Sequence, residues 1–203
     1  MRLYALVLAA GESVRMGRPK ALLPWEGGTL IEFQAGQLLA GGIERVILVV
    51  GHEAEAVRRV ASPLARTTIV LNQDYARGRA SSVRAGMEAT PADADALMVL
   101  AVDQPRPAAL IAHLRQAHET SGALITVPAL GGRHGHPTIF SRELFPEMRD
   151  VREETQGLRA VRHRHRERTQ VVEMATRAPL IDVNTPGEYE AALAFFAPLG
   201  RGS

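Results

Sequence analysis

The chain opens with an apolar run at residues 3–9, followed directly by the glycine-rich segment Leu8-Ala-Ala-Gly-Glu-Ser-Val-Arg-Met-Gly-Arg-Pro-Lys20. Gly11 and Gly17 allow the backbone to turn tightly and to approach a ligand closely. Backbone amides exposed in such a turn can bind phosphate oxygens. A loop that follows the first strand directly lies at the carboxyl edge of an α/β sheet, where such sheets bind their ligands. The segment therefore predicts an α/β fold with an anion site at that edge.

Lys20 is the only lysine of the chain, because 23 of its 24 lysine and arginine residues are arginine. The two residue types differ where a compact point charge must meet a phosphate oxygen. A single lysine at the end of a glycine-rich loop is thus a candidate phosphate ligand, and Arg15 and Arg18 add positive charge to the same loop. The count alone fits equally well with a lysine retained by chance on a solvated loop, and the surrounding loop favours the phosphate ligand.

The composition is that of a globular protein with one core. At 203 residues, with 46% hydrophobic and 23% charged residues, we expect a single domain at residues 1–198 and a tail at 199–203. A formal net charge of +2 gives no general signature of nucleic-acid binding. The absence of cysteine excludes disulfides and thiolate metal sites. No apolar run approaches the roughly 18 residues of a membrane span, and no signal peptide is recognisable. We therefore expect a cytoplasmic protein without a nucleic-acid or membrane partner.

Apolar and β-branched runs alternate with helical patterns. Strands are predicted at residues 3–9, 45–50, 67–71, 96–102, 123–127, 137–140 and 169–174. The first five runs are almost continuously apolar, as in strands buried on both faces of a sheet. Helices are predicted at residues 29–41, 53–60, 81–89, 107–120 and 185–196, two of them opened by the capping boxes Thr29–Glu32 and Thr185–Glu188. This alternation predicts a doubly wound, mostly parallel sheet with helices on both faces.

The regular alternation ends after residue 128. A turn-rich loop follows at residues 131–137, and a polar segment at residues 153–167 is expected to be helical. We expect these residues to form an insertion beside the edge of the sheet and not a separate domain.

Two familiar phosphate loops do not match the first loop. A Walker A loop needs four residues between its glycines and then Lys-Ser or Lys-Thr, whereas five residues separate Gly11 from Gly17, and Arg18 follows. The dinucleotide fingerprint G-x-G-x-x-G is also absent. The loop instead resembles the signature L-A-A-G-x-S-x-R-M-G-x-x-K of nucleotidyltransferases with a glycosyltransferase-A-like fold. The chain meets each of its fixed positions: Gly11, Ser13, Arg15, Met16, Gly17 and Lys20.

Later segments narrow this resemblance to the molybdenum cofactor cytidylyltransferases. The matching elements are Leu22-Leu-Pro-Trp25, Asn72-Gln-Asp-Tyr-Ala-Arg-Gly-Arg-Ala-Ser-Ser82, Asp103-Gln-Pro105, Gly135-His-Pro137 and Asp182-Val-Asn-Thr-Pro186. The resemblance as a whole covers residues 3 to about 196. In the last element Asn184 stands where relatives often have aspartate, so the metal role falls to Asp182.

The resemblance implies a fold like that of the nucleotide-diphospho-sugar transferases and a Mg²⁺-dependent enzyme. The implied reaction transfers CMP from CTP to a phosphate acceptor, molybdopterin or its molybdenum form, and releases pyrophosphate. An apo-molybdoenzyme or its maturation factor is the implied protein partner. Alternatives that remain open are a nucleotidyltransferase that uses GTP or acts on a sugar phosphate or another small anion, and a non-catalytic protein that binds and delivers the finished cofactor.

The same resemblance implies roles for individual residues. Catalytic roles fall to Lys20, Arg15 and Asp103, metal binding to Asp103 and Asp182, and acceptor binding to His136. Nucleotide binding falls to Ala9, Ala10, Gly11, Ser13, Arg15, Lys20, Asn72, Gly78 and Ser82. These types fit the chemistry, because nucleotidyl transfer needs cations and Mg²⁺ to stabilise negative charge that develops on the α-phosphate, and Mg²⁺ prefers carboxylate oxygens.

Structural roles compete with these assignments. Asp103 could cap the helix that starts near Pro107, although the spacing is poor, and Asp182 could be an ordinary turn residue. Asn72 could form a turn while Ser81 or Ser82 caps a helix, and a role in reading the base could coexist with that. His136, between glycine and proline, is as often structural as functional.

The basic run Arg162-His-Arg-His-Arg-Glu-Arg168 also has several readings. No aromatic residues interleave with it to stack on bases, which argues against nucleic acid. A solvated helix face is the usual explanation of such a run, and attraction of an anionic substrate is the functional alternative.

Overall fold

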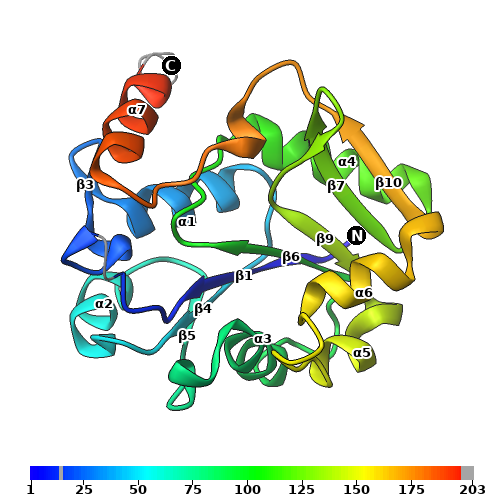
Figure 1. The fold of residues 1–203 in the computed structure, drawn as a ribbon, viewed down its shortest axis with the longest axis horizontal. Helices are drawn as coiled ribbons and strands as arrows, with labels where there is room; N and C mark the ends of the chain where they lie inside the picture. The colour runs from blue at the N-terminus through cyan, green and yellow to red at the C-terminus, as the bar shows by residue number, and fades with distance from the viewer. Residues whose placement is uncertain (14–15, 198–203) are drawn as a thin grey trace.

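A computed structural model describes residues 1–13 and 16–197 of the chain as three layers, with helices on both faces of one central sheet (Figure 1). The strand order is β10-β7-β9-β6-β1-β4-β5, and β8 pairs with β7. The expected doubly wound, mostly parallel α/β sheet is thus confirmed. The expected domain boundary at residue 198 and the tail 199–203 lie outside the described residues.

The sheet is parallel except at β8 and β9. Its strands are β1 (Leu3–Ala9), β4 (Val46–Val50), β5 (Thr67–Leu71), β6 (Ala96–Ala101), β7 (Ile125–Leu130), β8 (Arg133–His134), β9 (Thr138–Ser141) and β10 (Thr169–Glu173), and a separate hairpin joins β2 (Pro24–Trp25) to β3 (Gly28–Thr29). β1 lies between β4 and β6, with Val7 opposite Leu48 on one side and Leu100 on the other. Every residue of β1, β4 and β6 is buried, which explains their continuous apolar runs.

Helices pack on the two faces through alternate strand residues. Leu3, Ala5 and Val7 of β1 belong to one core cluster with α1 (Leu30–Ala40), α2 (Ala54–Ala61) and α4 (Ala108–Ser121). Tyr4, Leu6 and Leu8 belong to the other, with α3 (Arg79–Glu88), α5 (Phe145–Arg149) and α6 (Leu158–Arg164). Because side chains alternate across a strand, one seven-residue strand holds both helical layers in place.

A third, smaller cluster fixes the end of the described chain. α7 (Pro186–Phe196) begins at the expected capping box, where the hydroxyl of Thr185 accepts a hydrogen bond from the backbone N–H of Glu188. Its Phe196 packs edge-on against Trp25 of the β2–β3 hairpin, with ring centroids 5.7 Å apart. This contact brings the segment before α7 back beside α1 and the hairpin, as Figure 1 shows at the upper left.

Three expectations about the second half of the sheet were wrong. Residues after 128 do not form an insertion beside the sheet edge, because β9 inserts antiparallel between β6 and β7 and so belongs to the sheet. The helix expected at residues 153–167 is limited to α6, since Gln156 and Gly157 have positive φ angles. The strand at residues 67–71 is only half-buried, because β5 lies at the edge of the sheet.

Within residues 1–13 and 16–197, no helix combines the length and apolarity that crossing a membrane requires.

Candidate active site

The carboxyl ends of β1 and β6 border a cavity of about 590 Å³, here called cavity A. Eight of the residues expected to form the site line it together, and they come from three separate parts of the chain. They are Ala9, Ala10, Gly11, Ser13, Lys20, Gly78, Ser82 and Asp103. Arg15, the remaining residue of the expected loop, lies outside the described residues. Parallel strands end at the same edge of a sheet, which is why residues so distant in sequence meet here.

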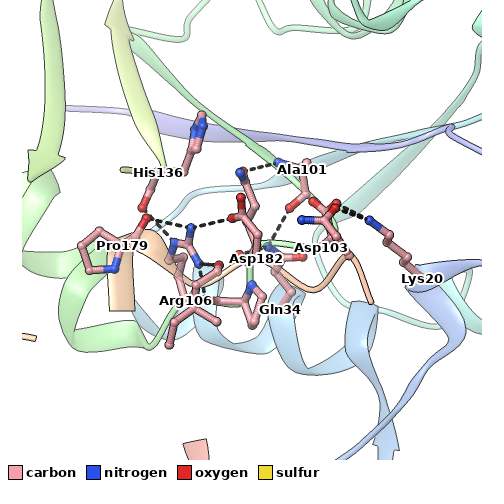
Figure 2. A network of polar contacts seen from close by, with 12 residues as sticks. Lys20, Gln34, Ala101, Asp103, Arg106, His136, Pro179 and Asp182 are labelled. Atoms are coloured by element: carbon pink, nitrogen blue, oxygen red, sulfur yellow. Dashed lines mark hydrogen bonds and ion pairs between the residues drawn. The ribbon is translucent and has the colours of Figure 1, made fainter. Parts of the chain in front are cut away.

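Lys20 makes the central contact of cavity A. Its Nζ donates to Oδ2 of Asp103 at 2.6 Å and to Oδ1 of Asn184 at 2.8 Å. The side chains of Lys20 and Asp103 are only 12% and 17% exposed, so this ion pair is shielded from solvent. Figure 2 shows the lysine reaching the aspartate from the side of the first loop. One cation from the start of the chain thus holds two oxygen ligands, one from its middle and one from near its end.

The loop geometry aims Lys20 at this position. The hydroxyl of Ser13 accepts a hydrogen bond from the backbone N–H of Lys20 at 3.2 Å, which closes the loop on itself. Ser13 has a φ of 54°, an uncommon conformation for a residue with a side chain. A short 3-10 helix at Lys20–Leu22 follows. Lys20 is therefore the first residue of a short helical turn, and its side chain extends across the carboxyl ends of the strands toward Asp103.

Asp182, the second expected metal ligand, has a different partner. Its Oδ1 lies 3.6 Å from Nη2 of Arg106, a side chain that is 1% exposed. Burial raises the pKa of Asp182, Arg106 opposes that rise, and the charge of Asp103 adds to it. The backbone N–H of Val183 donates to the carbonyl of Asp103 at 2.8 Å, so Asp182 and Asn184 flank a residue anchored on the Asp103 turn. Of these two, the structure joins Asn184 to the Lys20–Asp103 pair.

Asn72 does not line cavity A. Its amide nitrogen donates to the hydroxyls of Ser81 and Ser82 at 2.9 and 3.0 Å, and its Oδ1 accepts from the backbone N–H of Asp74 at 3.0 Å. The side chain is 5% exposed, so these bonds leave it no free donor. Asn72 therefore orients the turn at residues 74–82, while Ser82 and Gly78 face the cavity.

The backbone conformation at the start of α3 favours glycine at position 78. Gly78 has a φ of +102°, and a Cβ at this position would lie 2.6 Å from the carboxyl carbon of Glu153. That carboxylate accepts a hydrogen bond from the backbone N–H of Ala80 at 2.8 Å, where the helix dipole favours negative charge. Ser81 and Ser82 lie inside α3, so neither is its N-cap residue, which is Gly78.

A second hollow, cavity B, adjoins cavity A and has a volume of about 380 Å³. Polar and charged residues lining it include Arg79, Gln104, His136, Thr138, Arg159 and Arg162. Arg79 also lines cavity A, so the two hollows share a wall. Nδ1 of His136 and Oγ1 of Thr138 are buried without a hydrogen-bond partner in the described part of the chain. Unpaired buried polar atoms are costly unless a ligand or water satisfies them.

His136 is held as a neutral imidazole. Burial, together with the positive charges of Arg106, Arg162 and Arg79, lowers its pKa to about 4. A neutral imidazole has one donor and one acceptor nitrogen. His136 can therefore hydrogen-bond to a polar ligand in cavity B without adding positive charge, while the arginines supply that charge.

Sequence reasoning missed four contributors to the site. Arg106 and Glu153 gave no motif, because their partners are backbone groups far away in sequence. Gln34 donates to the carbonyls of Ala101 and Gln104 and so supports the Asp103 turn from α1. Asn184 did give a signal, since it occupies a position where the resembling family often has aspartate.

The comparisons with known proteins identify the class: the chain is a nucleotidyltransferase. It belongs to the family described as the MobA-like NTP transferase domain, whose model matches residues 5–169.

Individual relatives span most of the chain. The molybdenum cofactor cytidylyltransferase of Escherichia coli is 28% identical over 193 residues, which are 92% of this chain and 94% of the relative. The nicotine blue oxidoreductase of Paenarthrobacter nicotinovorans is 37% identical over 149 residues, 70% of this chain and 72% of the relative. The crystal structure of Rv0371c from Mycobacterium tuberculosis superposes with a TM-score of 0.82 at 27% identity, covering 96% of this chain and 98% of that one. A complex of Rv0371c with manganese gives a TM-score of 0.76.

Proposed function

We propose that the protein transfers CMP from CTP to a phosphate-bearing acceptor, molybdopterin or its molybdenum form, and releases pyrophosphate. The observation that carries this proposal is the bridge from Lys20 to Asp103 and Asn184 inside cavity A. The similarity to a molybdenum cofactor cytidylyltransferase over 92% of the chain supports the choice of substrates.

The donor set around Lys20 fits a hard divalent cation. A carboxylate oxygen of Asp103 and an amide oxygen of Asn184 both contact the ammonium of Lys20. The ammonium here takes the place of a metal cation. Mg²⁺ binds one or two such oxygens and completes its shell with substrate phosphate and water. We propose Asp103 and Asn184 as ligands, with Asp182 as the further carboxylate assigned from sequence. When bound, Mg²⁺ would neutralise charge on the triphosphate. The described residues contain no group of three or more His, Cys, Asp or Glu placed to hold a metal ion, which matches a metal whose shell is completed by substrate phosphate and water.

In this proposal the chain's own residues position the triphosphate and stabilise its developing charge. The amides around Gly11 face the phosphates, and the ammonium of Lys20 moves from the Asp103 carboxylate toward the α-phosphate. An oxygen of the acceptor phosphate forms a bond to the α-phosphorus while the bond to the β-phosphate oxygen breaks. That phosphate is already ionised at neutral pH, so the step needs no protein nucleophile and little help from a base. Positioning and charge stabilisation account for the catalysis.

Cavity B is our candidate for the acceptor site. It shares the wall at Arg79 with cavity A, so an acceptor bound there can reach a nucleotide in cavity A. Arg159 and Arg162 match an anionic group, while the unpaired polar atoms of His136 and Thr138 match a polar ring. This assigns Arg162, the first residue of the basic run, and the nearby Arg159 to the attraction of an anionic substrate and leaves the rest of the run as solvated surface.

Pyrophosphate release tests the reaction class and the base together. The purified chain is incubated with Mg²⁺, each of CTP, GTP, ATP and UTP, and molybdopterin or its molybdenum form. We expect pyrophosphate with CTP only. Release with GTP would overturn the cytidylyl assignment and leave the reaction class intact. Release with a sugar phosphate in place of molybdopterin would reassign the acceptor.

Two other candidate functions have a specific reason to be tested. Binding of CTP and acceptor without release of pyrophosphate is the result expected of a carrier that delivers the finished cofactor. The 37% identity to a nicotine blue oxidoreductase favours an oxidoreductase as the other candidate. Incubation with NADH or NADPH tests that candidate, since our proposal expects their absorbance to stay unchanged. An apo-molybdoenzyme or its maturation factor in the cytoplasm remains our proposed recipient of the product.

A further inference from the structure

Arg106 is the most deeply buried charged side chain near the site. It is 1% exposed and donates to four backbone carbonyls. Nε bonds to His136 O at 2.8 Å, Nη1 to Pro105 O at 2.7 Å and Ile181 O at 2.6 Å, and Nη2 to Pro179 O at 3.0 Å. Figure 2 shows the guanidinium between His136, Pro179 and Asp182.

Burying this charge is expensive, and packing alone does not explain it. Burial lowers the pKa of Arg106 to about 10 even though the charges of Asp182 and Asp103 oppose that change. Apolar residues of similar volume often replace buried charges without loss of stability. What an apolar residue cannot supply is a planar fork of five donors that reaches several carbonyls at once. The value of Arg106 therefore lies in the segments that it joins.

Those segments belong to different halves of the site. His136 lies in the loop at residues 135–137 and lines cavity B. Pro179 and Ile181 lead directly into the turn at residues 182–184, which carries Asp182 and Asn184. Arg106 itself follows Asp103 by three residues. One side chain thus connects the acceptor cavity, the Asp103 turn and the turn that supplies Asn184.

Direct contacts between the two loops reinforce this connection. The backbone N–H of His136 donates to Pro179 O at 2.9 Å, the carbonyl that also accepts from Arg106. Gly135 packs so closely on the same carbonyl that a Cβ would lie 2.3 Å from its oxygen. A displacement of the 179–181 segment is therefore passed on both to His136 and to Asn184.

We propose that Arg106 is a positioning residue that couples the acceptor loop at residues 135–137 to the turn at residues 182–184, so that His136 and Asn184 take their places together. This inference rests on the proposed function only for the names of the ligands. The geometric coupling itself is independent of the reaction catalysed.

The test compares Arg106→Met and Arg106→Lys with the wild-type protein. Mn²⁺ affinity, measured by electron paramagnetic resonance, reports on the turn at 182–184. The imidazole NMR signals of His136, assigned by loss in His136→Gln, report on the acceptor loop. We expect both variants to weaken Mn²⁺ binding by about tenfold or more, as for other residues that orient metal ligands, and to shift the His136 signals. Kinetically, acceptor KM should rise more than KM for CTP.

A matched control separates positioning from general destabilisation. Leu114→Ala removes a fully buried side chain of α4 and should lower Tm while leaving Mn²⁺ affinity and the His136 signals unchanged. If Arg106→Met does not fold, Arg106→Lys serves as the test variant. Lysine keeps the positive charge and the aliphatic stem but cannot reach all four carbonyls. Unchanged Mn²⁺ affinity and His136 signals in a folded Arg106 variant overturn the inference. Absence of turnover with any acceptor in the wild-type protein would instead count against the proposed function, while the NMR readout would still decide the role of Arg106.

Discussion

The ammonium of Lys20 lies 2.6 Å from Oδ2 of Asp103, although 83 residues separate them in sequence. Two groups to which sequence analysis assigned different roles, a phosphate ligand and a metal ligand, are thus each other's partners. Charge-assisted hydrogen bonds of this kind are strong when shielded from water. In our proposal, binding of a nucleotide with its metal replaces this pair with two new ones, Lys20 with phosphate and Asp103 with the metal.

Replacement of Lys20 by alanine should reduce turnover without preventing folding. Removing one preorganised cation from a developing negative charge costs about 10²–10³ in kcat. Lys20→Arg should also be impaired, because a planar guanidinium cannot place a compact charge between Asp103 and Asn184. Steady-state pyrophosphate release measures both variants.

Arg18→Ala supplies the control for Lys20. It removes a neighbouring positive charge from an exposed position of the same loop and should retain wild-type kcat within about twofold, since isolated surface charges contribute little. A Lys20→Ala protein with normal kcat would refute the central role given to this lysine.

Metal affinity should distinguish Asn184 from Asp182. Asp103→Asn and Asn184→Ala each remove an oxygen that contacts the bridging cation, and we expect Mn²⁺ binding to weaken by about 10–100-fold in each. Asp182→Asn keeps the shape of the side chain beside Arg106 and should have a smaller effect. Calorimetric titration with Mn²⁺ gives the order of the three affinities. A loss of Mn²⁺ affinity confined to Asp182→Asn would return the metal role to Asp182 alone.

Asn72→Ala should destabilise the protein. Its amide bonds to Ser81, Ser82 and Asp74 are buried, and their removal leaves unpaired polar groups, which cost about 1–3 kcal/mol. Chemical denaturation measures the change in the free energy of unfolding. Gln73→Ala, at the exposed neighbouring position, should change it by less than about 0.5 kcal/mol; equal losses in the two variants would argue against the bonding described.

Stability should fall as the pH is lowered through the range in which free imidazoles gain protons. The pKa of His136 lies at about 4 in the folded protein, against an ordinary value of 6.5. Between these values the unfolded chain binds a proton that the native protein lacks, so the free energy of unfolding decreases as pH falls. From pH 7 to 5 this residue should contribute a loss of about 2 kcal/mol.

The pH dependence of His136→Gln isolates this contribution. Burial also lowers the pKa of His118, but that residue is present in both proteins and its effect cancels in the difference. Denaturation curves at several pH values between 7 and 5 should show a flatter profile for His136→Gln than for the wild-type protein. Parallel profiles would mean that His136 titrates normally in the native state.

Local patterns predicted much of the fold and part of the site. The buried strands and the capping boxes at Thr29 and Thr185 are determined by neighbouring residues, and they were predictable for that reason. The place of β9 inside the sheet depends on pairing with β6 and β7, which no local pattern reveals. Likewise, the glycine-rich loop predicted Lys20, whereas the roles of Arg106 and Glu153 depend on carbonyls and amides brought close only by the tertiary fold.

The distance along the chain between Lys20 and Asn184, 164 residues, sets the order in which the protein becomes competent during translation. At roughly 5–20 residues per second, the ribosome adds Asn184 many seconds after Lys20. Through most of that interval the nascent chain contains β1, β4 and β5 but lacks Asn184. In our proposal, metal and nucleotide therefore find a complete site only on a chain whose sheet is already synthesised, so that synthesis itself withholds activity from unfinished protein.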